Sequence, residues 1–270
     1  MGMLIIGVIL FFIIGVILSL IGSGGAILTI PVLVYLFNVD SVLATSYSMF
    51  IMGISNWVAT FDNIKSNTIF YKMGLVFAIP GLFVTYSIRR IVLPIIPDII
   101  FKNSFIIVNK GSGIMLVFAI LIFIAAVRTL RNNNISNFNT PIIYNYYKNA
   151  LQGAGVGIVT GFVGAGGGFL IVPALAFTSK LPMRNAVATS LFIISITTSL
   201  GFLGDRNYFT NMNWKFLITC TICSVLGVFT ANLIKNRFNN RGLKLLFGYV
   251  IFLLGVFVLI TELLKLEINF

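Results

Sequence analysis

The sequence predicts an all-α polytopic membrane protein of about eight hydrophobic segments arranged as two homologous halves. Hydrophobic residues make up 59% of the 270 residues and charged residues only 9%, whereas a soluble domain carries about a quarter charged residues. Eight spans of about 20 apolar residues with short loops fit this length. No hydrophilic stretch is long enough for a separate soluble domain, and a glycine-rich break that occurs twice indicates a duplication.

The repeated break reads GSGGAILTIPVL in its first copy and GAGGGFLIVPAL in its second. Gly22 and Gly164 are 142 residues apart, and so are Pro31 and Pro173. Each break interrupts an apolar run of membrane length, where glycines lower helix propensity and leave backbone groups that hydrocarbon cannot satisfy. Two such breaks at matching places predict a site where they meet.

The chain divides into a first half (1–130), a polar linker (131–149) and a second half (150–270). The apolar runs are expected at about 4–37, 41–60, 69–88, 113–127, 150–177, 186–203, 214–234 and 243–264. The first run of each half contains the break, and it forms either one long broken span or a re-entrant hairpin. Hairpins would make the two halves inverted, and the basic loops favour that arrangement over a parallel one.

The links between the runs are polar and basic. Pro80 is expected to kink the third run, and a basic, proline-containing connection that begins at Arg89 and Arg90 is expected to follow it. The central linker is the most polar stretch of the chain, and we expect it to be mobile. Its tyrosines suit a membrane–water interface.

Further matches between the halves extend the repeat. Ala44-Thr45-Ser46 corresponds to Ala188-Thr189-Ser190, and Asp62 corresponds to Asp205. Small residues spaced by four also recur, and this spacing lets helix backbones approach closely. The two series are Gly15, Ser19 and Ser23 in the first half and Gly157, Gly161 and Ala165 in the second.

The formal net charge of +12 is explained by basic loops that set the membrane topology and contact the anionic headgroups of the lipid bilayer. It does not indicate a nucleic-acid partner. The chain has no histidine, and Cys220 and Cys223 lie in an apolar run without further ligands. No cofactor and no metal site is therefore predicted, nor an enzyme, since no nucleophile–base set exists. No cleaved signal peptide is expected at the N-terminus, and a multi-pass protein of the plasma (inner) membrane is expected.

A broken helix offers an anion site. The segment after each break begins with unpaired N–H groups and a positive helix dipole, and transporters arrange discontinuous helices around substrate in this way. The glycines let an anion approach the backbone, and nearby hydroxyls add donors; glycine used only for tight packing is the alternative. The candidate substrate-binding residues are Gly22, Ser23, Gly24, Gly25, Thr45, Ser46, Gly164, Gly166, Gly167, Gly168, Thr189 and Ser190.

The six acidic residues are expected at solvated loop edges or near the C-terminal end. They are Asp40, Asp62, Asp98, Asp205, Glu262 and Glu267. A proton relay through a carboxylate in mid-membrane then has no candidate. Proton coupling, if the protein uses it, falls to an edge residue such as Asp62 or Asp205.

The duplicated break with its proline, followed about fifteen residues later by Ala-Thr-Ser, resembles the TauE/SafE family of sulfite exporters over nearly the whole chain. The resemblance implies a permease for sulfur-containing anions such as sulfite, sulfoacetate or related sulfonates, or for other small carboxylates. Ala26 stands where the second copy has Gly168, and Ser23 stands where it has Ala165. The two halves are therefore expected to hold an anion differently.

The sequence predicts a secondary membrane transporter whose partner is a small anion, with the site where the breaks meet. A channel for anions or neutral solutes remains an alternative because proton-relay residues are missing. A membrane scaffold subunit that does not transport is a second alternative. The sequence leaves the oligomeric state and the direction of transport open.

Overall fold

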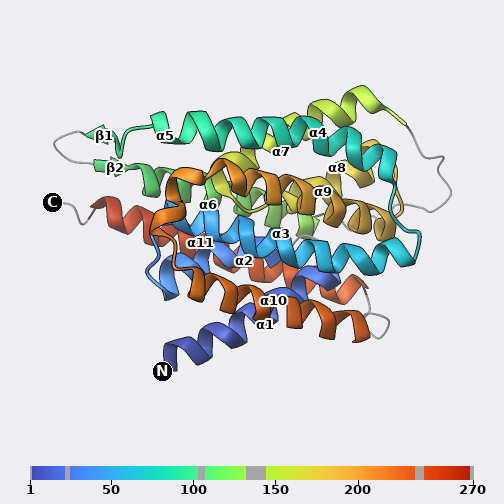
Figure 1. Cartoon of the computed structure of the whole chain (residues 1–270), viewed down its shortest axis with the longest axis horizontal. Helices are drawn as coiled ribbons and strands as arrows, with labels where there is room; N and C mark the ends of the chain where they lie inside the picture. The colour runs from blue at the N-terminus through green and yellow to red at the C-terminus, as the bar shows by residue number, and fades with distance from the viewer. Residues whose placement is uncertain (1, 22–24, 103–106, 132–143, 235–239, 268–270) are drawn as a thin grey trace.

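The structure is a computed structural model that describes residues 2–21, 25–102, 107–131, 144–234 and 240–267 (Figure 1). These residues are almost entirely helical. The helices are α1 (Gly2–Ile21), α2 (Gly25–Pro31), α3 (Ser41–Lys65), α4 (Tyr71–Ser87), α5 (Leu93–Ile95), α6 (Lys110–Arg131), α7 (Tyr146–Val163), α8 (Gly168–Thr178), α9 (Met183–Gly204), α10 (Trp214–Ile234) and α11 (Asn240–Glu267).

Three short stretches and a hairpin complete the described chain. Two π-helical stretches, η1 (Val32–Leu36) and η2 (Ile88–Val92), continue α2 and α4, and a 3₁₀ helix, η3 (Arg206–Asn211), follows α9. The strands β1 (Ile99–Lys102) and β2 (Ile107–Asn109) pair antiparallel. This hairpin departs from the all-helical prediction, and it occupies part of the connection that was expected to be a basic loop.

Five helical stretches are long and apolar enough to cross a membrane: Ser41–Lys65, Tyr71–Ile95, Lys110–Val127, Met183–Gly204 and Trp214–Leu233. Three shorter apolar helical stretches accompany them: Ile6–Ile21, Ile27–Leu36 and Gly248–Leu264. The described residues therefore have the composition and helix lengths of a multi-pass membrane protein. The helix α4 continues through Pro80. The linker (131–149), which is expected to be mobile, is described only at its ends, where α6 ends at Arg131 and α7 begins at Tyr146; residues 132–143 lie outside the described residues.

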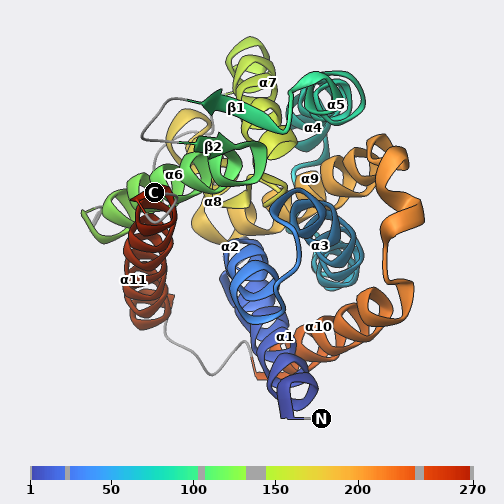
Figure 2. The same ribbon diagram turned by 90° about the vertical axis from the view of Figure 1, so that its left-hand side faces the viewer.

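Helices far apart in the sequence pack in pairs: α1 on α10, α4 on α7, α6 on α11 and α3 on α9. Seen along the helices, α3 lies between the α1–α10 pair and the α4–α7 pair (Figure 2). The helices α3 and α9 run antiparallel, because Gly53 faces Ser199 while the earlier Met49 faces the later Gly201.

Glycines bring two of these helix pairs into backbone contact. A Cβ atom on Gly15 would lie 1.9 Å from the backbone oxygen of Ser224, so α1 and α10 touch through their backbones. A Cβ atom on Gly157 would lie 2.5 Å from the backbone oxygen of Gly81, which joins α7 to α4 in the same way. The close approach expected from the spacing of small residues is observed at both glycines.

The second glycine break has a defined backbone. The helix α7 ends at Gly164, which adopts a left-handed conformation (φ 73°), and Gly166 and Gly167 follow with φ values of 67° and 62°. Residues with a Cβ atom rarely adopt this conformation. The break therefore needs its glycines, and α8 restarts the helix at Gly168. At the first break, α1 ends at Ile21 and α2 begins at Gly25.

Candidate functional site

A buried ion pair joins η2 to the end of α9. Arg89 Nη1 donates to Asp205 Oδ2 at 2.9 Å, and both side chains are fully buried. The sequence-based expectation of a basic loop at Arg89 and a solvated edge at Asp205 is wrong. The helix continues from α4 into η2, so Arg89 stays on a helix that packs against the end of α9. Each charge then compensates the high desolvation cost of the other.

Thr45 and Ser46 of α3, two of the predicted substrate-binding residues, contact Arg89. Its Nη1 also donates to Thr45 Oγ1 at 3.0 Å and to Ser46 Oγ at 3.4 Å. The two hydroxyls in turn donate to the carbonyl oxygen of Val42 at 2.6 and 3.4 Å. Thr45 and Ser46 therefore lie at the site as acceptors from the guanidinium, and they fix its position relative to α3.

Three polar atoms of the ion pair have no hydrogen-bond partner among the described residues: Arg89 Nε, Arg89 Nη2 and Asp205 Oδ1. Arg89 Nη2 faces the second break, because a Cβ atom on Gly164 would lie only 2.6 Å from it. A buried donor that lacks an acceptor costs about 1–3 kcal/mol. A guanidinium held with free donors in a buried position is therefore suited to a ligand that supplies acceptors.

The second break lies where α3, α7 and α9 meet. Gly164 contacts Thr45 of α3, Gly166 contacts Thr198 of α9, and Gly167 contacts Thr160 of α7. The eleven-residue helix α8 begins directly after them, and its first N–H groups have no intrahelical acceptor. The Arg89 charge and the start of α8 each favour negative charge, and Gly164, which lies beside Arg89, precedes the start of α8 by four residues.

The remaining predicted residues divide into two groups. Gly22, Ser23 and Gly24 lie outside the described residues, and Gly25 begins α2. Thr189 Oγ1 accepts a hydrogen bond from the Phe70 backbone N–H at 3.1 Å, and Ser190 Oγ donates to the Val187 oxygen at 2.8 Å.

Thr189 and Ser190 are distant from Arg89. Sixteen residues of α9 separate Thr189 from Asp205, which corresponds to about 24 Å along a helix. The structure therefore brings Thr45, Ser46 and Gly164 together with Arg89 but not with Thr189 or Ser190.

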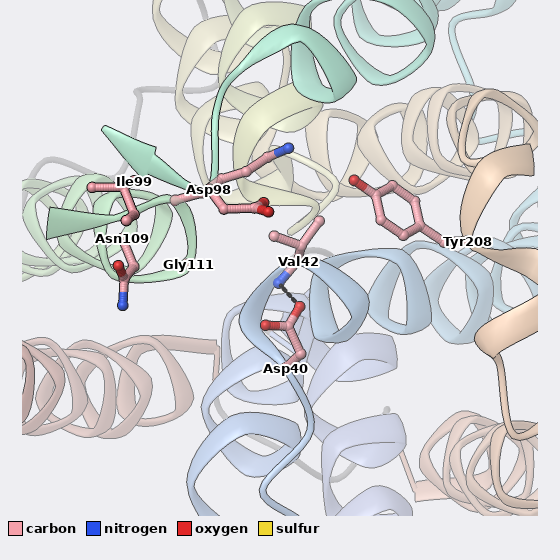
Figure 3. Close-up of a pocket in the computed structure, with 8 residues that line it drawn as sticks. Asp40, Val42, Asp98, Ile99, Asn109, Gly111 and Tyr208 are labelled. Carbon is pink, nitrogen blue, oxygen red and sulfur yellow. Dashed lines mark hydrogen bonds between the residues drawn. The ribbon is translucent and has the colours of Figure 1, made fainter. Parts of the chain in front are cut away.

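A cavity of about 390 Å³ opens beside the ion pair (Figure 3). The Asp98 carboxyl group and the Tyr208 hydroxyl group point toward one another across it. The cavity lies near the site, because its lining residue Tyr208 is three residues from Asp205 and its N–H donates to the Asp205 backbone oxygen at 2.8 Å. It is lined by Asp40, Val42, Asp98, Ile99, Asn109, Lys110, Gly111 and Tyr208.

Burial changes the pKa values of Asp205 and Tyr208. Asp205 lies one residue beyond α9, and burial raises the pKa of its carboxyl group, an effect that the Arg89 charge only partly offsets. Burial likewise raises the pKa of Tyr208, and the negative charge of Asp205 adds to this. The carboxyl group of Asp205 is therefore easier to protonate than an ordinary aspartate.

A second buried acid lies outside this site. Glu262 of α11 is fully buried, and its Oε1 accepts a hydrogen bond from the Tyr35 hydroxyl of η1 at 2.8 Å. The expectation of a solvated acid near the C-terminal end is wrong here, because α11 packs against α6 and α2 and Glu262 faces Tyr35. Among the described residues, no group of three or more His, Cys, Asp or Glu side chains could hold a metal ion.

Sequence comparisons place the chain among membrane transporters. It is 26% identical to "Probable membrane transporter protein YunE" of Bacillus subtilis over 272 residues, covering 92% of this chain and 94% of that protein. It is 23% identical to a "Probable membrane transporter protein" of Xylella fastidiosa, covering 91% of each chain. No solved structure matches the chain. The family model described as "Sulfite exporter TauE/SafE" matches residues 7–258, and the chain belongs to this family.

Proposed function

We propose that the protein is a secondary carrier for a small, sulfur-containing oxyanion, which binds between Arg89 and the second glycine break. The observation that carries this proposal is the buried guanidinium, whose Nε and Nη2 lack acceptors among the described residues and whose Nη2 faces Gly164. A bound anion would supply the missing acceptors. The family name supports the sulfur chemistry of the substrate, and the relatives' names support transport.

The chemistry of the site favours an oxyanion. A guanidinium donates two parallel hydrogen bonds to the oxygens of one group, and the start of α8 adds backbone donors. A sulfite or sulfonate group carries three oxygens on one sulfur, so it can accept from Arg89 and from α8 at once. A carboxylate has only two oxygens and satisfies fewer of these donors. Glycine at 164 permits the close approach, because any larger residue would fill the space beside Nη2.

The packing of the helices supports a carrier built from inverted halves. The antiparallel helices α3 and α9 begin with the matching Ala-Thr-Ser segments. The pair α1–α10 resembles the pair α7–α4, since each joins the first helix of one half to the later helix of the other. Inverted repeats give a carrier two related conformations, one open to each side of the membrane. The proposed site then combines Arg89 and Thr45 of the first half with Gly164 of the second.

The test is anion flux into proteoliposomes that contain the purified full chain, with sulfite and methanesulfonate as probes. We expect saturable flux in the wild type and at least about a tenfold loss of anion affinity in Arg89→Gln. The matched control is Arg206→Gln, because Arg206 is an exposed cation near the same end of α9. Equal affinity in Arg89→Gln and Arg206→Gln would refute the assignment of the site. Flux that never saturates would favour a channel, and the absence of flux of any small anion would favour a scaffold.

A further inference from the structure

Asp205 lies beside the position that an anion bound to Nε and Nη2 of Arg89 would occupy. Its Oδ2 accepts from Arg89 Nη1 at 2.9 Å, while its Oδ1 has no hydrogen-bond partner in the described part of the chain. An anion on the same guanidinium would bring a second negative charge beside this buried carboxylate. Two negative charges in one buried site repel each other strongly, and such sites relieve the repulsion by binding a proton.

We propose that Asp205 binds a proton when the anion binds, so that the carrier moves an anion and a proton together. This inference rests on the proposed function and deepens it. In the empty site, the Arg89 cation pairs with the Asp205 carboxylate. When the anion pairs with Arg89, the carboxylate takes one proton from water and becomes a neutral carboxylic acid. For a monovalent anion, the buried site has zero net charge before and after loading, so neither state leaves an unpaired charge in the membrane interior.

A cavity lies near Asp205, on the side of η3. The cavity of about 390 Å³ is lined by Tyr208, whose backbone N–H donates to the backbone carbonyl oxygen of Asp205. The titratable or charged groups around Asp205 are Arg89 from η2 and Tyr208 from η3, while α3 presents only the hydroxyls of Thr45 and Ser46. Farther out, the cavity is lined by Asp40, Asp98 and Lys110. The Lys110 ammonium group donates to the Leu93 and Ile96 oxygens.

The matching position in the other half lacks this arrangement. Asp62 precedes Asp205 by 143 residues, and the same shift relates Arg89 to Asn232. Asn232 Oδ1 accepts a hydrogen bond from Ser19 Oγ at 2.5 Å and carries no charge. Asp62 is only partly buried. The proposed repeat therefore contains one arginine–aspartate pair, and Asp62 is a matched control residue for Asp205.

The experiment is calorimetric titration of the purified full chain with the monovalent anions methanesulfonate and ethanesulfonate, which take up no proton themselves near neutral pH. Comparison of two buffers with different ionisation enthalpies gives the number of protons taken up for each anion bound. We expect uptake of about one proton for each anion in the wild type and in Asp62→Asn. We expect Asp205→Asn to bind the anion with no proton uptake.

Two results would overturn the coupling and leave the proposed function intact: anion binding without proton uptake in the wild type, or unchanged proton uptake in Asp205→Asn. No binding of either probe would overturn the proposed function together with the coupling. Asp205→Asn also removes the partner of a buried charge. Asp205→Glu is therefore the second variant, and since it keeps a carboxyl group, it should keep the proton uptake. The wild-type titration tests the coupling without any variant.

Discussion

Arg89 and Asp205 neutralise each other's charge, and the contribution of this pair to protein stability can be measured separately from its role in anion binding. Removal of one partner of a buried ion pair costs about 3–5 kcal/mol, whereas replacement of both partners by apolar residues is often neutral. We therefore expect Arg89→Ala and Asp205→Ala to lower the free energy of unfolding by amounts of this order. The double variant Arg89→Met/Asp205→Leu should recover most of that loss. Denaturant unfolding in detergent measures these differences.

The same double variant tests whether the pair has a function beyond stability. Without a guanidinium it should bind no anion, although it folds. A double variant that is stable and still transports a small anion with unchanged affinity would exclude Arg89 from the binding site. If the double variant were as unstable as the single variants, the loss would not come from an unpaired charge alone. It would then include the hydrogen bonds that Thr45 and Ser46 accept from Arg89.

Glu262 provides a second prediction for a single residue. Its Oε1 accepts from the Tyr35 hydroxyl at 2.8 Å in a buried setting. Glu262→Gln keeps an acceptor oxygen, whereas Glu262→Ala removes it and should lower the free energy of unfolding by about 1–3 kcal/mol more than Glu262→Gln does. The control is Leu263→Ala, since Leu263 is an exposed neighbour on the same helix. Equal stability of the Ala and Gln variants would contradict a stabilising hydrogen bond to Tyr35.

At the scale of elements, the second glycine break needs a residue without a side chain at position 164, beside Arg89. In Gly164→Ala, the new Cβ atom would lie 2.6 Å from Arg89 Nη2 and 2.6 Å from Thr45 Cβ, at a backbone φ of 73°. Backbone strain alone costs on the order of 1–3 kcal/mol. We expect anion affinity in a binding titration to fall by at least about tenfold, because the methyl group occupies the space beside the guanidinium.

Gly155→Ala is the matched control for the break, because Gly155 lies on the preceding helix α7, is exposed, and has no other atoms within 4 Å of an added Cβ. Alanine at such a helical position stabilises by about 0.4–1 kcal/mol. Affinity in Gly155→Ala should therefore equal that of the wild type. If Gly164→Ala also bound the anion normally, the space beside Arg89 would not be part of the site.

The two π-helical stretches have a common feature at the scale of elements. Tyr35 in η1 binds Glu262, and Arg89 in η2 binds Asp205. Each stretch is in the first half and contacts a fully buried acid from the second half. A π-helical turn changes the direction of the side chains relative to an α-helix, and such turns are frequent at functional sites. In this protein they direct polar side chains to partners that the periodicity of the sequence does not indicate.

At the scale of the whole molecule, the antiparallel packing of α3 and α9 makes a prediction about topology. Ser66 follows α3 and Arg206 follows α9, and both are exposed. Inverted halves place these equivalent loops on opposite sides of the membrane. In a chain with Cys220 and Cys223 replaced by alanine, a membrane-impermeant thiol reagent should label Ser66→Cys from one side and Arg206→Cys only from the other. Labelling of both from the same side would indicate parallel halves.

The candidate site could be predicted only in part. Thr45, Ser46 and Gly164 could be named because they belong to a duplicated pattern, and the structure brings them to one place. The sequence predicts a basic connection at Arg89 and a solvated edge at Asp205, because each directly follows an apolar run, where a charged residue is usually solvated. The sequence marks both residues by the position of a charge immediately after such a run, which many surface residues share, and marks Asp205 also by its match with Asp62. Thr189 and Ser190 belong to the same pattern but lie toward the opposite end of α9 from Asp205.

The sequence by itself determined the membrane class, the apolar segments, the two breaks and the family, because these depend on composition and on short patterns along the chain. Only the tertiary structure decided which acids are buried and which residues share a site. Burial and pairing depend on contacts between segments more than 100 residues apart, such as Arg89 with Asp205. Local periodicity contains no information about those contacts, since either end of an apolar helix can face water or a partner.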